Sequence, residues 1–147
     1  MTMVEINEFM KQKIKQYIQD KNVCVIATCF ENEPRVSTVN YVSDGFTLYI
    51  VTSRKSIKCK NIKANPNVSV AIDDQGRKER ACLQAEGVAE ILAGVQAERA
   101  RKFYSQKRDV SRHEPQLVDT ILKVDLRKIM FLDYTKEGLK VHKFNIL

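Results

Sequence analysis

The sequence predicts a mainly β protein, a β-barrel with helical decoration that forms one domain over residues 1–147. The first observation behind this prediction is that seven or so short segments are apolar or alternate in polarity, and turn residues separate them. The second is that three other segments carry apolar residues at helical spacing. The third is the length of 147 residues, which suits a single domain and contains no internal repeat or linker.

The first half of the chain predicts a helix, three strands and a second, short helix. Apolar residues at helical spacing predict an amphipathic helix over roughly residues 3–20: Ile6, Met10, Ile14, Tyr17 and Ile18. Three β-branched or alternating segments then predict an antiparallel meander with short turns, over 23–30, 35–42 and 46–52. Ser56 is a good N-cap, so we expect a short helix over 56–64 that Asn65-Pro66 ends.

The second half of the chain predicts the remaining strands and one more helix. Five segments have strand-like composition, at 68–72, 80–92, 121–126, 128–134 and 139–144. Turns are expected over 73–77, around Gly76, and at Lys136-Glu137-Gly138. Gly87 lies inside the longest segment, which suggests a β-bulge or a close backbone approach. Residues 95–106 return to helical spacing and predict the third helix.

Cysteine usage and apolar patterning indicate a small soluble protein of the cytoplasm. No apolar run approaches the roughly 20 residues that a transmembrane helix needs, and the N-terminus lacks the apolar region of a secretory signal. The four cysteines have no secretory context, so we expect reduced thiols rather than disulfides. Strand alternation places Cys24 and Cys82 in the core.

Several classes of site are excluded by motifs that the chain lacks. The two histidines, His113 and His142, are far apart, and the spacing of Cys24 and Cys29 does not fit a zinc knuckle, so we expect no metal site. The five scattered glycines form no phosphate loop, which excludes Rossmann and P-loop nucleotide sites. No GxSxG or Ser-His-Asp pattern is present, and no catalytic acid or base stands out.

The net charge of +7 at pH 7 points to an anionic partner, and most of the excess lies in one segment. No acidic residue occurs between Asp44 and Asp73, whereas five basic residues do: Arg54, Lys55, Lys58, Lys60 and Lys63. This segment is either a solvated helix face or a surface that binds an anion. Nucleic acid is disfavoured as the partner, because no aromatic residue that could stack on bases lies between Tyr49 and Phe103.

Part of this basic segment has the features of a phosphate site. A strand is expected to end at Thr52, a polar loop follows, and Ser56 opens a helix with Lys58 in its first turn. The start of a helix presents unpaired backbone N–H groups and a partial positive charge. Hydroxyl groups and an ammonium group at the same place would complete an anion site. The alternative is a plain surface helix.

The segment from Pro34 to Ile72 resembles the FMN-binding split-barrel family, the pyridoxamine 5′-phosphate oxidase-like proteins. The features that carry the resemblance follow one another in the family's order: the strand Arg35–Asn40, Thr52, Ser56 with Lys58, Asn65-Pro66 and the strand Val68–Ile72. The strand Ala81–Ile91 with Gly87 is similar to the one that follows them in the family. The resemblance implies a six- to seven-stranded antiparallel split β-barrel with an N-terminal helix, a short helix after the third strand and a further helix.

The resemblance also implies a bound cofactor, FMN, with the deazaflavin F420 as the alternative. The phosphate of FMN would be held by Ser56, Lys58 and the backbone at Ile57. The ribityl chain and the edge of the ring would be lined by Val51, Thr52 and Ser53. A strand beside the isoalloxazine would give backbone hydrogen bonds to its pyrimidine side, over Arg35, Ser37, Val39 and Asn40. Members of this family are typically homodimers with the flavin at the subunit interface, so we expect a homodimer.

The function that the resemblance implies is that of an FMN-dependent oxidoreductase acting on an unidentified small molecule. Two alternatives stay open, a non-catalytic protein that binds or stores flavin and an F420-dependent reductase. The chain departs from the true pyridoxamine phosphate oxidases, since it has no Trp and carries Lys140-Val141-His142 where those enzymes have Arg-x-His for the substrate. We therefore expect no oxidation of vitamin B6, and we place His142 on a strand with its ring at the surface.

Overall fold

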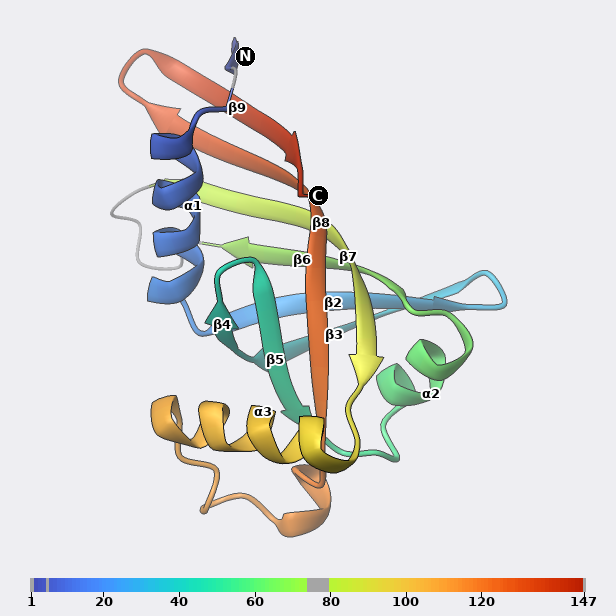
Figure 1. The fold of residues 1–147 in the computed structure, drawn as a ribbon. Helices are drawn as coiled ribbons and strands as arrows, with labels where there is room; N and C mark the ends of the chain where they lie inside the picture. The colour runs from blue at the N-terminus through green and yellow to red at the C-terminus, as the bar shows by residue number, and fades with distance from the viewer. Residues whose placement is uncertain (1, 5, 74–79, 147) are drawn as a thin grey trace.

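The computed structural model describes residues 2–4, 6–73 and 80–146, which form one curled sheet flanked by helices (Figure 1). This architecture is the predicted split β-barrel with helical decoration. Nine strands occur in the described residues, rather than six or seven, partly because the three-residue strands β1 and β4 add to the count. The elements are, in chain order, β1 (Thr2–Val4), α1 (Glu8–Asp20), β2 (Val23–Phe30), β3 (Glu33–Asn40), β4 (Val42–Asp44), β5 (Thr47–Thr52), α2 (Ile57–Ala64), β6 (Asn67–Asp73), β7 (Ala81–Ile91), α3 (Gly94–Lys107), a 3₁₀ turn (Pro115–Leu117), β8 (Thr120–Thr135) and β9 (Gly138–Asn145).

The sheet is organised around the long strand β8, whose two halves have different neighbours (Figure 1). Its first half pairs with β5 and its second half with β9, while β7 pairs with it along most of its length. Beyond β7 the strand order continues through β6 and β2 to β3, which is therefore an edge strand. All these pairs are antiparallel; β1 joins the other end by pairing parallel with β9.

Some predicted elements have different bounds in the structure. The first helix begins at Glu8 instead of residue 3, because the side chain of Asn7 caps it by accepting from the Met10 N–H at 2.8 Å. Residues 2–4 form a strand with β9 instead. The segments expected at 121–126 and 128–134 are one strand, β8. Of the turn expected over 73–77, residues 74–77 lie outside the described residues.

The predicted three-strand meander is wrong beyond its first pair. β2 and β3 form the expected antiparallel hairpin, but β3 ends at Asn40 and a separate strand, β4, follows. Strand alternation breaks here because Tyr41 and Val42 are both buried, and the Tyr41 hydroxyl donates to the Ile18 carbonyl at 2.7 Å. β5 then pairs with β4 and with β8, which is far away in the sequence, instead of with β3.

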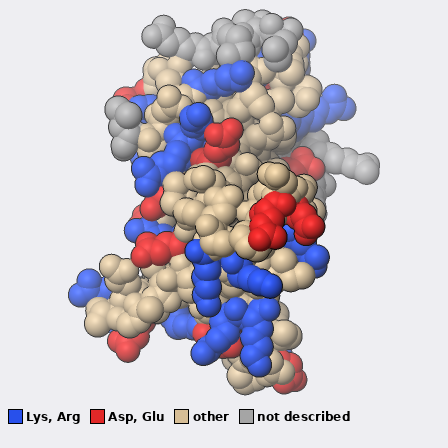
Figure 2. Space-filling model, turned by 90° about the vertical axis from the view of Figure 1, so that its right-hand side faces the viewer, with Lys and Arg blue, Asp and Glu red and all other residues tan. Residues whose placement is uncertain are grey.

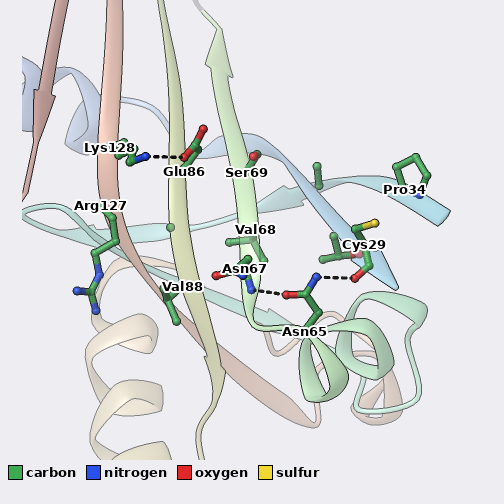
Figure 3. A pocket seen from close by; sticks show the side chains of 13 residues that line it. Cys29, Pro34, Asn65, Asn67, Val68, Ser69, Glu86, Val88, Arg127 and Lys128 are labelled. Atoms are coloured by element: carbon green, nitrogen blue, oxygen red, sulfur yellow. Dashed lines mark hydrogen bonds and ion pairs between the residues drawn. The ribbon is translucent and has the colours of Figure 1, made fainter. Parts of the chain in front are cut away.

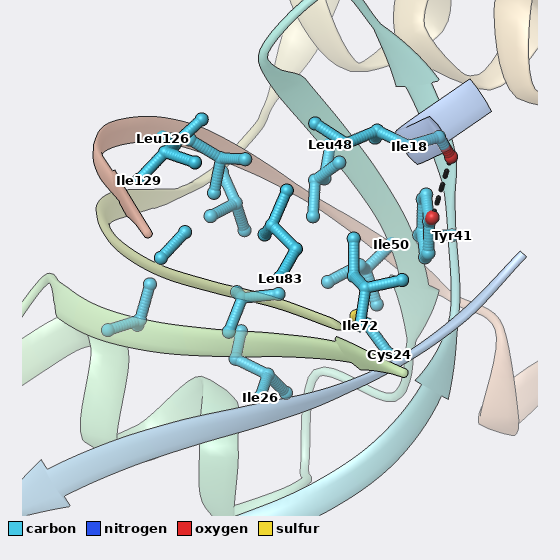
Figure 4. Close-up of a cluster of buried hydrophobic side chains, with 14 of the residues drawn as sticks. Ile18, Cys24, Ile26, Tyr41, Leu48, Ile50, Ile72, Leu83, Leu126 and Ile129 are labelled. Atoms are coloured by element: carbon cyan, nitrogen blue, oxygen red, sulfur yellow. Dashed lines mark hydrogen bonds between the residues drawn. The ribbon is translucent and has the colours of Figure 1, made fainter. Parts of the chain in front are cut away.

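The main core fills the inside of the curled sheet beneath α1. The helix contributes Ile14 and Ile18 to this cluster. Ile18 lies among fully buried strand residues such as Leu48 and Ile50 (Figure 4). Cys24 is buried in this core, as predicted. Cys82 is only half-buried, because its neighbours Ala81 and Leu83 occupy the core-facing positions of β7.

The three α-helices cover different parts of the sheet. α1 lies over the main core, and α2 packs against β2 and β7. α3 lies against β8 and closes a second, smaller cluster of buried residues: Val42, Leu92, Ala100, Tyr104 and Ile121. Over residues 2–4, 6–73 and 80–146, none of the helices has the length and apolar character needed to cross a membrane.

Candidate functional site

The loop between β5 and α2 is held in one conformation by its own serines. The Ser53 carbonyl accepts from the Ser56 N–H at 3.0 Å, and the Ser53 hydroxyl accepts from the Lys55 N–H at 3.2 Å. The Ser56 hydroxyl then accepts from the Cys59 N–H at 3.3 Å and caps α2. The predicted N-cap is therefore confirmed, and the loop leads directly into the helix.

Arg54, at the centre of this loop, is bound to a distant part of the chain. Its backbone N–H donates to Oδ1 of Asp119 at 2.7 Å, and its Nε donates to Oδ2 of the same carboxylate at 3.0 Å. Asp119 immediately precedes β8, so these bonds tie the loop to the start of the longest strand. The Arg54 charge is thus paired within the protein, although the sequence placed it in the unbalanced basic segment.

Two backbone N–H groups at the start of α2 have no acceptor in the described part of the chain. Those of the last three loop residues, 54–56, and of Cys59 are bound as described above, and the Lys60 N–H donates to the Ser56 carbonyl at 3.2 Å. Ile57 and Lys58 are left, both in the first turn of α2. First-turn N–H groups point out of the helix end, where the helix dipole adds a partial positive charge. This arrangement can accept an anion.

The Lys58 side chain adds a cation to the same turn of helix. It is half-buried, and burial lowers the pKa of Lys58, while the nearby Cys59 acts in the opposite direction. A partly desolvated ammonium group attracts an anion more strongly than one in bulk water. Figure 2 shows Lys and Arg side chains gathered on the side of the molecule where α2 and the preceding loop lie.

α2 is anchored to the sheet by buried and half-buried amide side chains. Nδ2 of Asn61 donates to the Thr28 hydroxyl on β2 at 3.0 Å, and both residues are buried. Nδ2 of Asn65, which follows the helix, donates to the Cys29 carbonyl at 3.1 Å. These bonds fix both the axis of the helix and its end, so its first turn has a defined direction.

The predicted residues of β3 lie on two different faces of the strand. Side chains of directly paired strand residues share a face, and Arg35, Ser37 and Val39 are paired with residues of β2 that are buried on the core side: Thr28, Ile26 and Cys24. Asn40 therefore lies on the opposite, exposed face. Strand β3 contacts β5 but does not pair with it. The backbone groups on the free edge of β3 therefore have no partner strand in the described residues.

At the end of β5, the side chains of the predicted residues also point to opposite faces of the strand, as alternation requires. Thr52 is buried on the core side and pairs with Thr120 in the last step of the β5–β8 ladder. The Val51 side chain packs in the cluster under α3, so only its backbone could meet a ligand near α2. Ser53 is half-buried, and its hydroxyl is used within the loop.

Two grooves that sequence reasoning missed lie across the sheet. The larger, of about 650 Å³, is lined by residues of β2, β3, β6, β7, β8 and β9, among them Val25 and Val36. The smaller, of about 390 Å³, lies at the β-bulge at Glu86 and Gly87, beside Asn65 (Figure 3). None of the predicted site residues lines either groove. Gly87 was the only signal in the sequence, and its prediction as a bulge is confirmed.

His142 is not a surface residue, contrary to the prediction. It lies on β9 as expected, but its side chain is buried, with 4% of its surface exposed. Its Nδ1 has no hydrogen-bond partner among the residues that the structure describes, and its ring lies 6.3 Å from that of Phe131, its cross-strand neighbour. Burial lowers the pKa of His142, and the carboxylate of Asp133 acts in the opposite direction. A buried ring in this position belongs to the packing of β9 against β8.

Comparison with known proteins identifies the family. The chain matches the family model described as Pyridoxamine 5'-phosphate oxidase over residues 10–132. The chain belongs to the pyridoxamine 5′-phosphate oxidase family. It is 30% identical over 100 residues to General stress protein 26 of Bacillus subtilis (strain 168), a match that covers 67% of this chain and 69% of that protein.

Solved structures share the fold of this protein along most of the chain. General Stress Protein 26 from Bacillus anthracis str. Sterne has a TM-score of 0.69 at 23% identity, covering 93% of this chain and 98% of its own. An FAD-binding protein from Mesorhizobium loti has a TM-score of 0.67 at 19% identity, covering 82% and 90%. The resemblance seen in Pro34–Ile72 is therefore confirmed and extends well beyond that segment.

Proposed function

We propose that this protein binds FMN with its phosphate at the start of α2, and that it is an oxidoreductase for a small-molecule substrate. The observation that carries the proposal is the pair of N–H groups at Ile57 and Lys58, which have no acceptor in the described residues, in the same helical turn as the half-buried Lys58 ammonium group. Free N–H donors at a helix start together with a cation suit a phosphate group, and FMN ends in one.

Other residues of this chain fit the rest of such a ligand. The free edge of β3, over Arg35–Asn40, has backbone donors and acceptors of the kind that the pyrimidine side of a flavin can use. Thr52 and Ser53 lie between that edge strand and α2 in the chain, and would line the ribityl chain. The FAD-binding protein of similar fold supports a flavin, and a single anion site at α2 favours FMN.

The division of work between cofactor and protein follows from this arrangement. When bound, FMN would supply hydride transfer at its N5 atom. The residues of the chain would supply binding and orientation, with Ser56 and Lys58 at the phosphate and the β3 backbone at the ring. We propose that the protein acts in the cytoplasm, where its four free cysteines would stay reduced.

We propose in addition that two copies of the chain form a homodimer with the flavin at their interface. In one chain the proposed site residues lie outside both grooves described above, so a second subunit would be needed to enclose a ligand. The groove of about 650 Å³ lies next to exposed apolar side chains, Val36 at 67% and Val25 at 37% exposure. Exposed apolar surface of this kind is typical of protein interfaces.

The first test is the near-ultraviolet and visible absorbance spectrum of the purified protein, with mass analysis of any compound that heating releases. A flavin spectrum and the mass of FMN would support the proposal. A single absorbance band of the deazaflavin type and a released compound heavier than FMN would show that the cofactor is F420 instead of FMN. A colourless protein that also fails to bind added FMN would contradict flavin binding altogether.

A second measurement separates an enzyme from a flavin-storage protein. The rate at which NADPH or NADH reduces the bound flavin is compared with the rate for free FMN, and reoxidation is followed with candidate acceptors. Faster reduction of the bound flavin would support the oxidoreductase. Reduction no faster than that of free FMN would favour storage.

A further inference from the structure

The carboxylate of Asp119 lies at the point where the β5–β8 ladder ends. The last paired residues of that ladder are Thr52 and Thr120, and Asp119 directly precedes Thr120. Two residues after Thr52 the chain turns towards α2, and Asp119 accepts two hydrogen bonds from Arg54 at this turn, at 2.7 and 3.0 Å. The carboxylate thus continues the contact between β5 and β8 through a side chain, where backbone pairing has stopped.

Helix α3 is hydrogen-bonded to the residue that precedes Asp119. Nη1 of Arg101 donates to the carbonyl of Val118, the preceding residue, at 3.1 Å. The hydrogen bond from the Arg54 N–H lowers the pKa of Asp119, as do the charges of Arg54 and Arg101, against an opposing effect of desolvation. The carboxylate is therefore ionised at neutral pH and sits in a defined place. The carboxylate connects the start of β8 to the loop before α2, and the adjacent Val118 carbonyl connects the same segment to α3.

These bonds decide which donors of the loop remain available. Asp119 accepts from both the backbone N–H and the Nε of Arg54. Ser53 accepts from the N–H groups of Lys55 and Ser56, and the Ser56 hydroxyl accepts from that of Cys59. In the first turn of α2, the backbone donors left without an acceptor in the described residues are those of Ile57 and Lys58. Without Asp119, the Arg54 backbone N–H and Nε would lose their acceptor, and the loop would lose these two bonds to a distant element.

We infer that Asp119 is a positioning residue of the phosphate site: by fixing Arg54 it holds the loop so that the N–H groups of Ile57 and Lys58 point together at the phosphate of FMN. This inference rests on the proposed function, since it concerns the same site. Both carboxylate oxygens of Asp119 accept from Arg54, so Asp119 would act through the loop and not by contact with the ligand. We expect its effect to be strongest at the phosphate, because the loop that it holds at Arg54 leads into the first turn of α2.

The test compares two ligands that differ only in the phosphate, FMN and riboflavin. Flavin is removed from the protein, and the dissociation constants of both ligands are measured by fluorescence titration for the wild type, Asp119→Ala, Asp119→Asn and Arg54→Ala. We expect Asp119→Ala to weaken FMN binding about tenfold or more, as for loss of charge-assisted hydrogen bonds, and to weaken riboflavin binding much less. The FMN-to-riboflavin ratio is a quantity that a general loss of structure would not move.

We expect the other variants to weaken FMN binding by smaller amounts than Asp119→Ala. Asp119→Asn keeps one acceptor oxygen for the Arg54 N–H but presents an NH₂ group to Nε, so we expect an intermediate loss. Arg54→Ala keeps the backbone N–H bond to Asp119, so we expect a smaller loss than for Asp119→Ala. The matched control is Asp109→Ala, because Asp109 also accepts from a backbone N–H, that of Ser111 at 2.8 Å, but only within its own turn.

Three results would overturn the inference. If Asp119→Ala weakens FMN and riboflavin binding equally, Asp119 supports the fold and not the phosphate site. If Arg54→Ala loses more FMN affinity than Asp119→Ala, then Arg54 itself binds the phosphate. If the wild type binds FMN no better than riboflavin, the proposed phosphate site is wrong and the inference fails with it. Should Asp119→Ala not fold, the ratio for Asp119→Asn and Arg54→Ala decides.

Discussion

At the scale of single residues, Lys58 has the largest expected effect on flavin binding. It combines a half-buried ammonium group with a backbone N–H that has no acceptor in the described residues. Lys58→Ala removes the charge and keeps the backbone donor. We expect FMN binding to weaken by ~1.5–3 kcal/mol, the range for a hydrogen bond to a charged group, with folding nearly intact. Titration of the flavin-free variant with FMN, together with a thermal unfolding curve, measures both effects.

The control for this prediction is Lys60→Ala, on the same helix. Lys60 is exposed and two residues further on, so its loss changes the net charge equally without altering the first turn. Equal loss of affinity in both variants would mean that only the overall positive charge attracts FMN. Unchanged affinity in Lys58→Ala would show that the phosphate is bound elsewhere.

His142 gives a prediction about pH. Its lowered pKa means that the unfolded chain, with an ordinary histidine pKa of 6.5, takes up a proton before the folded protein does. As the pH falls from 6.5 towards the folded-state pKa, the unfolded state binds more protons, so the free energy of unfolding decreases. The slope from this residue approaches at most about 1.4 kcal/mol per pH unit.

Charged groups near His142 limit how far this slope can develop. Asp133 on β8 favours the protonated ring, whereas Lys13 on α1 and Lys140 on β9 oppose it. Urea unfolding between about pH 5 and 7.5 is compared for the wild type and His142→Phe, with His113→Gln as the control. The prediction is wrong if His142→Phe keeps the wild-type dependence on pH.

At the scale of elements, the pairing of β7 with β8 depends on the absence of a side chain at Gly87. A Cβ built there would lie 2.6 Å from the Asp125 carbonyl oxygen and 3.3 Å from the Leu126 Cα, both backbone atoms that cannot move alone. The register of the two strands shifts at this point, between Glu86 and Gly87. The glycine is therefore required by close backbone approach.

We expect Gly87→Ala to lower the free energy of unfolding by ~1–3 kcal/mol, the usual cost of inserting a methyl group into a well-packed site. Chemical denaturation measures the difference. Glu86→Ala on the neighbouring, exposed position serves as the control and should change stability by no more than about 0.5 kcal/mol, since its ion pair with Lys128 is exposed. A fully stable Gly87→Ala variant would mean that the bulge can shift at little cost.

The sequence predicted most elements but few of their partners, and the reason is physical. Turn residues, caps and alternation act over a few residues, so the α2 cap at Ser56, the hairpin turn at Gly138 and the bulge at Gly87 could be predicted. The pairing of β5 with β8, and the bond between Arg54 and Asp119, join residues far apart in the chain. Such contacts depend on how the whole sheet curls, which no local pattern encodes.

At the scale of the whole molecule, the proposed phosphate site lies on a helix packed against the sheet, and the exposed apolar surface lies on the sheet itself. The first turn of α2 is fixed from the inside, through Asn61 to β2 and through Arg54 to the start of β8. Val36 lies on the face of β3 opposite to Arg35 and Ser37, as alternation requires. A second copy of the chain that covered Val36 would therefore also lie next to the strand whose edge we propose for the flavin.

This arrangement predicts that dimerisation and flavin binding fail together. Val36→Asp places a charge on the apolar groove, so we expect it to raise the dimer dissociation constant about tenfold or more and to weaken FMN binding in parallel. Val95→Asp on α3, where the wild-type valine is 61% exposed against 67% for Val36, is the control and should remain dimeric. Sedimentation velocity over a range of protein concentrations, with and without FMN, measures both properties. If the Val36→Asp variant stays dimeric, the dimer interface lies on another face. If the wild type is monomeric at every concentration with FMN bound, the proposed homodimer is wrong.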